Sequence, residues 1–221
     1  MRSETVIGID GWKGGWVAVV LDGGRFEAAF CVPDIASLDA HYGDVAAVGI
    51  DMPIGFPTDG PRRSDVEARK FVGPRGSSVF TTLPEAAYRA GSYGAATEIT
   101  QRLWGKGISQ QSYALRTRVL EIDSAISAIG IHEIHPEVSF RAMAGQPLAW
   151  SKKTWNGQQQ RTDLLEQEGI VLPTHLGEAG TVPVDDILDA AACAWSADRI
   201  RRGEASTLPA DPLPGEPSIT Y

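Results

Sequence analysis

Apolar residues in the first fifty positions fall in short runs separated by tight turns, a pattern that predicts β-strands. Three such runs come first in the chain, at 6–10, 15–21 and 26–32. Asp22–Gly24 (Asp-Gly-Gly) is a strong hairpin signal between the second and third runs. A short helix is expected at 34–42, and the nearly continuous apolar run at 45–51 is typical of a strand covered on both faces. This order predicts a mixed sheet in an α/β layer fold.

Beyond residue 52, loops rich in proline and glycine alternate with segments of helical periodicity. Helices are expected at 64–71, 84–90, 95–103, 110–128 and 158–167, and a further buried strand at 131–135. The clearest helix spans 183–202, because acidic residues fill its first turn and three arginines precede Gly203. Residues 204–221 are proline-rich and are expected to be irregular.

Composition restricts the class of protein without identifying it. The 221 residues are 43% hydrophobic and 22% charged, which are ordinary globular values. The formal net charge of −8 argues against nucleic-acid binding through bulk electrostatics but leaves a local basic groove open. No signal peptide and no membrane span are expected, and the two distant cysteines, Cys31 and Cys193, are expected to be free thiols. Together these features predict a cytoplasmic protein, with its oligomeric state left open.

Acidic residues occupy unusual positions in the predicted elements. Asp10 and Asp51 each close an apolar strand, so both carboxylates emerge at one sheet edge if the strands are parallel neighbours. Asp186 and Asp189 lie three residues apart, on the helix face that carries the smallest residues. Small residues allow a helix to approach a sheet closely, which would bring these acids to the strand ends. Like charges so close cost free energy unless a cation lies among them, and this predicts a site for a hard divalent cation.

Each acid also has a structural interpretation. Asp10 could form a turn with the glycine that follows it, and Asp51 could accept hydrogen bonds from loop amides. Asp186 lies in the first helical turn, where acids interact favourably with the helix dipole. Asp189 is harder to explain in this way, because it lies among alanines inside the helix and has no cap to form.

Five segments resemble, in order, the motifs of the bacterial domain-of-unknown-function 429 family: GIDGWKGGW, IDMPIG, SVFTTLPEAAY, EIHPEVSF and DDILDAAACAW. The resemblance extends from Gly8 to about Arg202. The family is described as a predicted nuclease with a ribonuclease H-like fold. The resemblance therefore implies a five-stranded mixed sheet flanked by helices, with three antiparallel strands followed by parallel ones, in a single domain over 1–203. The stretch 53–129 departs from the pattern of resolvases with this fold and is expected to be a helical insertion between strands four and five.

For the site, the resemblance implies that Asp10, Asp51, Asp186 and Asp189 are catalytic carboxylates that bind Mg²⁺ or Mn²⁺. Two such ions would activate water and stabilise the leaving oxygen of a phosphodiester. From the residues themselves, His135 and Glu137 are candidates for a further ligand, a general base or a supporting group. Glu137 could instead interact with the dipole of the helix that follows it.

Basic residues form two local groups in this acidic chain. Candidate substrate-binding residues are Arg62, Arg63, Arg69 and Arg75 in the first group and Lys152 and Arg161 in the second. They could line a phosphate groove above the metal ions. The alternative is a solvated basic surface without a ligand.

Three functions remain under consideration. A metal-dependent nuclease, with nucleic acid or a nucleotide as its partner, accounts for the acids, the basic groups and the implied fold. A non-catalytic binding module with the same fold is the first alternative. The second is a nucleotide-binding phosphotransferase of the actin and sugar-kinase type, but such proteins need two domains with glycine-rich phosphate hairpins, and only one such opening motif is present.

Overall fold

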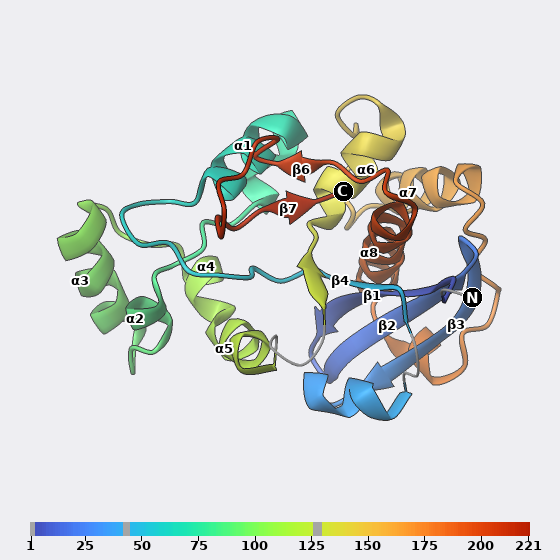
Figure 1. Cartoon of the computed structure of the whole chain (residues 1–221), viewed down its shortest axis with the longest axis horizontal. Coiled ribbons are helices and arrows are strands. Elements are labelled where there is room, and N and C mark those ends of the chain that lie inside the picture. Colours follow the sequence, from blue (N-terminus) through green and yellow to red (C-terminus); the bar gives the residue numbers. More distant parts are fainter. Residues whose placement is uncertain (1–2, 42–44, 126–129) are drawn as a thin grey trace.

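The computed structural model describes residues 3–41, 45–125 and 130–221. Its centre is a five-stranded sheet with the order β3-β2-β1-β4-β5 (Figure 1). The strands are β1 (Thr5–Trp12), β2 (Gly15–Asp22), β3 (Arg25–Val32), β4 (Ala47–Ile50) and β5 (Ile131–Glu133). β1, β2 and β3 are antiparallel, while β4 is parallel to β1 and β5 is parallel to β4. The predicted mixed α/β sheet is confirmed.

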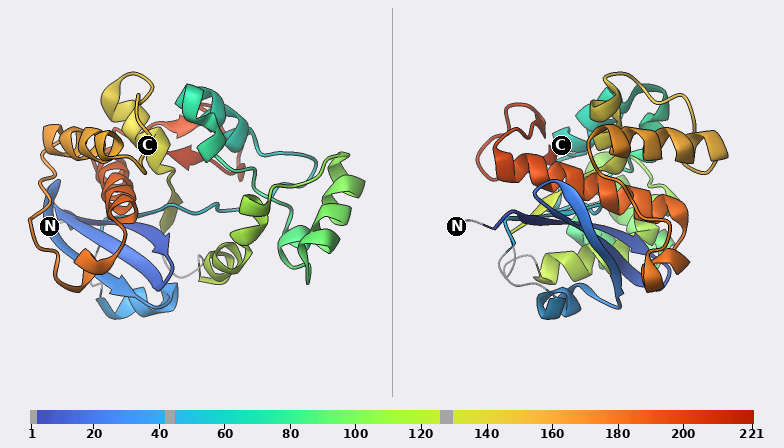
Figure 2. Two further views of the ribbon diagram at one scale, coloured as in Figure 1. Left: turned by 180° about the vertical axis from the view of Figure 1, so that it is seen from behind. Right: turned by 90° about the vertical axis from the view of Figure 1, so that its right-hand side faces the viewer.

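Alternation along the strands builds two apolar cores, one on each face of the sheet. On one face, Val6 and Val19 pack in a core with α6 (Pro136–Ala144), α7 (Trp155–Gln167) and α8 (Val184–Arg202). On the opposite face, Ile7 and Ile9 pack in a core with the 3₁₀ helix η1 (Ile35–His41) and residues of the insertion. Figure 2 shows α8 lying along one face of the sheet. Asp10 therefore projects on the α8 side, since it follows Val6 at even spacing.

Helices fill the segment between β4 and β5, as expected for an insertion. They are α1 (Arg63–Val72), η2 (Gly73–Ser78), α2 (Glu85–Tyr88), α3 (Tyr93–Trp104), α4 (Gln110–Ala114) and α5 (Arg116–Ala125). In Figure 1, α2 and α3 lie farthest from the sheet, while Val119 and Ile122 of α5 pack in the sheet core. The single helix predicted at 110–128 is divided at Leu115. Its last residues, 126–128, and Tyr42 of the predicted helix 34–42 lie outside the described residues.

The segment after α8 contains two short strands that the sequence did not indicate. β6 (Thr207–Leu208) and β7 (Ile219–Thr220) form a small antiparallel sheet beside α1 (Figure 1). Leu208 and Ile219 are buried in a third apolar cluster with Ala68 and Val72 of α1. This packing holds the chain end against the insertion. None of the described helices combines the length and the apolar character that a membrane span requires.

Helix α8 approaches the sheet unusually closely, and two glycines make this possible. A Cβ atom on Gly8 of β1 would lie 2.0 Å from the backbone nitrogen of Ala194. A Cβ atom on Gly49, beside the end of β4, would lie 2.7 Å from the carbonyl oxygen of Cys193. The helix backbone that meets these two glycines belongs to the small residues Ala190, Cys193 and Ala194.

We predict that Gly8→Ala destabilises the protein by about 3 kcal/mol or more, because the clash is with helix backbone that cannot rotate away. Gly91→Ala is the matched control, since a Cβ there would meet nothing within 4 Å, and it should change stability by less than about 0.5 kcal/mol. Urea unfolding of both variants measures the two effects. A loss below about 1 kcal/mol for Gly8→Ala would contradict the close approach.

Candidate metal centre

β1 and the end of β4 carry the same tripeptide, Gly-Ile-Asp, at residues 8–10 and 49–51, and β1 continues for two residues beyond Asp10. The two strands are parallel with Ile9 opposite Ile50, and the amide of Asp51 donates to the carbonyl oxygen of Ile9 at 2.9 Å. In each tripeptide the isoleucine belongs to the core on the insertion side of the sheet. Alternation therefore directs the glycine and the aspartate toward α8.

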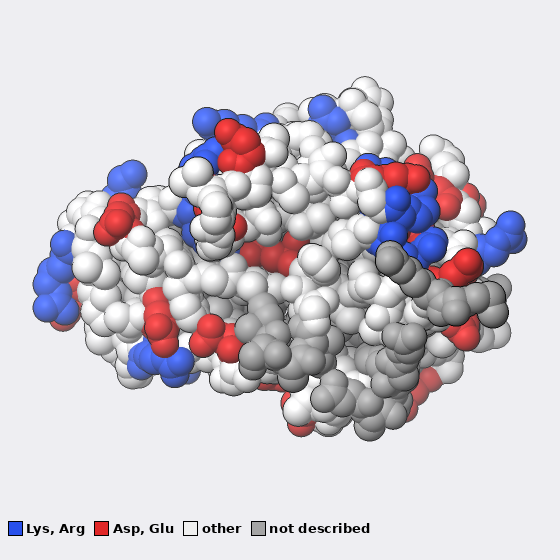
Figure 3. Space-filling view, viewed as in Figure 1, with Lys and Arg blue, Asp and Glu red and all other residues white. Residues whose placement is uncertain are grey.

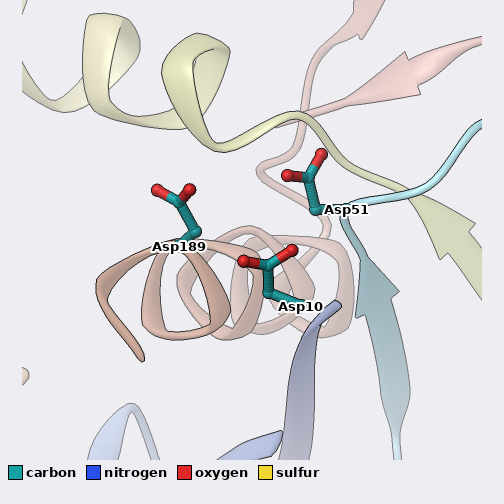
Figure 4. A group of neighbouring side chains, drawn as sticks. All are labelled: Asp10, Asp51 and Asp189. Atoms are coloured by element: carbon teal, nitrogen blue, oxygen red, sulfur yellow. The ribbon is translucent and has the colours of Figure 1, made fainter. Parts of the chain in front are cut away.

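The glycines let α8 bring a third carboxylate to this edge of the sheet. Ligand oxygens of Asp10, Asp51 and Asp189, the carboxylate trio, all lie within 4.8 Å of one another (Figure 4). Asp10 and Asp189 are buried and Asp51 is partly exposed. Asp10 also accepts a hydrogen bond from the amide of Gly11 at 2.7 Å, which fixes its orientation. Three acids from three elements thus converge on one point.

The carboxylate trio faces a cavity of about 290 Å³. The other titratable side chains that line it include Glu133, His135, Glu137, Lys152, Asp186 and Arg118. In Figure 3 acidic side chains occupy the central hollow of this face, whereas Lys and Arg gather toward its margins. The electrostatic character of the cavity is therefore mainly acidic.

Burial raises the pKa values of all three acids. Burial is the largest cause of the raised pKa of Asp10, followed by the charges of Asp51 and Asp189. Burial likewise raises the pKa of Asp51, although His135 and Lys152 oppose it. Burial raises the pKa of Asp189 to about 7, against the favourable charge of Lys152. Holding these acids ionised therefore costs free energy, and a divalent cation would offset that cost.

Unpartnered buried atoms beside the carboxylate trio test whether the site suits a metal ion. Among the described residues, Oδ1 of Asp189, Oε2 of Glu137 and Nδ1 of His135 are buried without a hydrogen-bond partner. Each belongs to a residue that lines the cavity. Buried polar atoms are usually paired, so these three atoms are available to bind a cation in the cavity. Carboxylate oxygens are the preferred ligands of Mg²⁺ and also suit Mn²⁺, and the donor set fits either ion.

The remaining predicted acidic and imidazole residues occupy the same cavity in different ways. Asp186 lines the cavity and is partly buried, but it does not belong to the carboxylate trio. Nε2 of His135 lies 3.4 Å from the carbonyl oxygen of Ser78. Oε1 of Glu137 accepts from Nη2 of Arg161 at 2.5 Å. Glu137 thus forms an ion pair and also lies in the first turn of α6, where an acid interacts favourably with the helix dipole.

Two of the predicted substrate-binding arginines are held in buried ion pairs with acids. Arg62 is buried between Asp65 and Glu133, with nitrogen–oxygen distances of 2.5 and 2.6 Å. Arg161 is completely buried, and its ion pair with Glu137 orients that carboxylate beside the carboxylate trio. Both guanidinium groups are thus used to fix acids of the cavity wall.

The other predicted cations divide between the surface and the site. Arg63 pairs with Asp211 and Glu216, Arg69 donates to the carbonyl oxygen of Val79, and Arg75 donates to that of Ala149. None of these three lines the cavity that holds the carboxylate trio. Lys152 does line it, and its Nζ donates directly to Oδ2 of Asp189. Of the six predicted cations, Arg62 and Lys152 therefore line the cavity.

Sequence reasoning did not identify Arg118 or Glu133 as site residues. Arg118 of α5 donates to the carbonyl oxygens of Trp12 and Gly15, and its guanidinium stacks on the Trp16 ring at 4.8 Å. It thereby fastens the insertion to the turn that follows Asp10. No pattern around Arg118 distinguishes it from the neighbouring basic residues. For Asp10 and Asp51, by contrast, the repeated Gly-Ile-Asp tripeptide is a sequence pattern that indicates two equivalent site residues.

Comparison with protein families places most of the chain in one of them. A family model described as "Protein of unknown function (DUF429)" matches residues 8–213, which is most of the chain. No curated protein matches the chain, and no solved structure matches it. The match thus supports the five motifs as a family signature but brings no activity with it.

We predict that Arg62→Met costs about 3–5 kcal/mol of stability, because it leaves Asp65 and Glu133 buried without a counter-ion. Arg63→Met is the control: this arginine is largely exposed, and the loss of its surface pairs should cost about 1 kcal/mol or less. Chemical denaturation of the two variants compares them directly. Similar losses for both would show that the buried pairs are no more important than surface ones.

We also predict a pH effect on the metal-free protein. The native state retains the Asp189 proton up to about pH 7, whereas the unfolded chain releases it near the usual pKa of 3.8. The native state therefore binds more protons in this window, and the free energy of unfolding falls as the pH rises through it. Asp189→Asn should flatten this dependence in melts with a chelator. Parallel profiles for wild type and variant would contradict the raised pKa.

Proposed function

The chain belongs to this family of unknown function, DUF429, and we propose that it is a divalent-metal-dependent phosphodiester hydrolase. The observation that carries the proposal is the convergence of three carboxylates within 4.8 Å from two strand ends and a helix. Mg²⁺ or Mn²⁺ is the proposed cofactor. A nucleic acid or a nucleotide is the proposed substrate class, with cleavage of a phosphodiester bond as the reaction.

The cost of the arrangement supports a catalytic role over a binding module. Bringing three acids together with two of them buried is unfavourable, and Gly8 and Gly49 leave the space that lets the helix carrying Asp189 approach the strands. A scaffold that only bound a partner would be more stable with neutral residues at these positions. Sites that carry such a cost are typical of catalysis and of metal binding.

Each residue has a proposed task. Asp10, Asp51 and Asp189 would hold the ion, and Glu137, whose Oε2 is unpartnered and whose charge acts on Asp51 and Asp189, would help to hold a second one. Nδ1 of His135 is unpartnered and is proposed to accept the proton of the attacking water. Asp186 is proposed as an outer acid of the same centre. When bound, the ions supply Lewis-acid polarisation of the phosphoryl group and a water nucleophile that is reactive near neutral pH.

The charges around the cavity also bear on how the phosphate is held. Arg62 and Arg161 are occupied by internal ion pairs. The phosphate is therefore proposed to be held chiefly by the ions, with few direct contacts from arginine. This arrangement fits the acidic net charge of the chain.

Calorimetric titration of Mn²⁺ is the first test. Wild type should bind, and Asp10→Asn should bind at least about 10- to 100-fold more weakly while keeping its fold. The fold should survive because an asparagine oxygen can still accept from the Gly11 amide. Asp163→Asn, at an exposed position of α7, is the matched control and should bind as wild type does. Equal affinity for all three proteins would remove Asp10 from the metal centre.

The same proteins then serve in a hydrolysis assay with bis(p-nitrophenyl) phosphate and with single- and double-stranded oligonucleotides. Activity that requires Mn²⁺ or Mg²⁺ and is lost in Asp10→Asn is the expected result. Metal binding without hydrolysis of any of these phosphodiesters would favour the binding-module alternative. Hydrolysis that persists in a chelator would contradict the proposed chemistry.

A further inference from the structure

Lys152 stands out because its ammonium group lies among the acids that are proposed to bind the metal. Its Nζ donates to Oδ2 of Asp189 and lies 3.9 Å from Oδ2 of Asp185. Its charge also acts on Asp10 and Asp51, so it interacts with every member of the carboxylate trio. The side chain is 31% exposed and lines the cavity, which gives it a route out of the centre.

We propose that Lys152 is a resident cation of the carboxylate centre, which a divalent ion must displace in order to bind. This inference rests on the proposed function, since it concerns the same site. It assigns to Lys152 a role in setting metal affinity that differs from the substrate binding expected from the sequence. Without metal, the ammonium group partly neutralises the carboxylate trio. With metal, it withdraws from Asp189 toward the mouth of the cavity.

Charge and ligand geometry require this exchange. Oδ2 of Asp189 is the oxygen that Lys152 holds, while Oδ1 of the same carboxylate has no partner among the described residues. An ion coordinated by the carboxylate trio would lie within a few ångströms of the ammonium group. Two positive charges at such a separation repel strongly in a partly buried site. The lysine therefore competes with the ion for the same carboxylate.

The segment that carries Lys152 is held firmly, so the side chain can move without the backbone. Arg161 donates to the carbonyl oxygen of Trp150 at 3.2 Å, just before the lysine. Thr154, just after it, donates to the carbonyl oxygen of Ser151 at 2.8 Å and caps α7 by accepting from Gly157. The flexible stem of a lysine permits the ammonium group to swing between two positions on a fixed backbone.

Lys153 provides a matched comparison on the same segment. Its Nζ donates to Asp185, which is outside the carboxylate trio, and its side chain is 69% exposed. Removal of either lysine deletes one positive charge near the start of α8. Only the removal of Lys152 deletes the cation from the metal position. The two variants therefore separate a local competition from a general change in charge.

The experiment titrates Mn²⁺ into wild type, Lys152→Met, Lys152→Arg and Lys153→Met, with thermal melts of each in chelator and in Mn²⁺. Measurements at about pH 8 limit competition by protons for the carboxylates. Lys152→Met should bind Mn²⁺ about 10-fold more tightly than wild type, because its competitor is absent. It should also melt lower in chelator and regain stability with Mn²⁺. Lys152→Arg, which keeps a cation, and Lys153→Met should stay near wild-type affinity.

Two results would overturn the inference, and they are distinguishable from each other. Mn²⁺ binding to wild type with equal or weaker binding to Lys152→Met would show that the lysine does not compete, while the metal centre itself would stand. No Mn²⁺ binding to wild type or to any variant would reject the centre and the inference together. If Lys152→Met fails to fold in chelator, Lys152→Gln replaces it in the same comparison. Mn²⁺ binding to Lys152→Met alone would support the inference most strongly, because it would show that Lys152 completely blocks Mn²⁺ binding in the wild-type protein.

Discussion

The close approach of α8 to the ends of β1 and β4 is the constraint on which the candidate site depends. It exists because Gly8 and Gly49 have no side chain at the two points where helix backbone meets strand. Two residues further along each strand, alternation places an aspartate on the same face of the sheet. One geometric feature therefore brings the helix in and aligns the acids with it. A wider gap would separate Asp189 from the strand carboxylates.

The second consequence of this approach is an electrostatic cost that the surrounding residues share. Burial raises the pKa of each acid of the carboxylate trio. Lys152 at the centre and arginines behind the cavity wall pair with acids of the site and reduce this cost. Arg161 orients Glu137, and Arg62 neutralises Glu133. The cavity thus remains acidic at its centre, which favours a divalent cation over an anionic ligand alone.

The insertion between β4 and β5 takes part in the site as well as in the core. The last helix of the insertion, α5, packs against the sheet, and its Arg118 donates to the turn that follows Asp10. The first helix, α1, packs against the small β6–β7 sheet. The insertion and the segment after α8 therefore both lie beside the same cavity. Since Ile219 also lines that cavity, the segment after α8 helps to enclose it.

The local pattern of the sequence determined the strands of the five-stranded sheet, the long final helix and the positions of Asp10, Asp51 and Asp189, because strand alternation and helix periodicity depend on neighbouring residues only. The α/β sheet order followed from these elements and from the family resemblance. Only the tertiary structure decided the partners of the charged residues. Arg62, Arg161 and Lys152 find acids that lie between 3 and 71 positions away along the chain, and composition cannot distinguish such a buried pair from a free basic surface. The same reason explains Asp186: helix periodicity places it on the right face, but only the contact between helix and sheet decides which acid of that face reaches the centre.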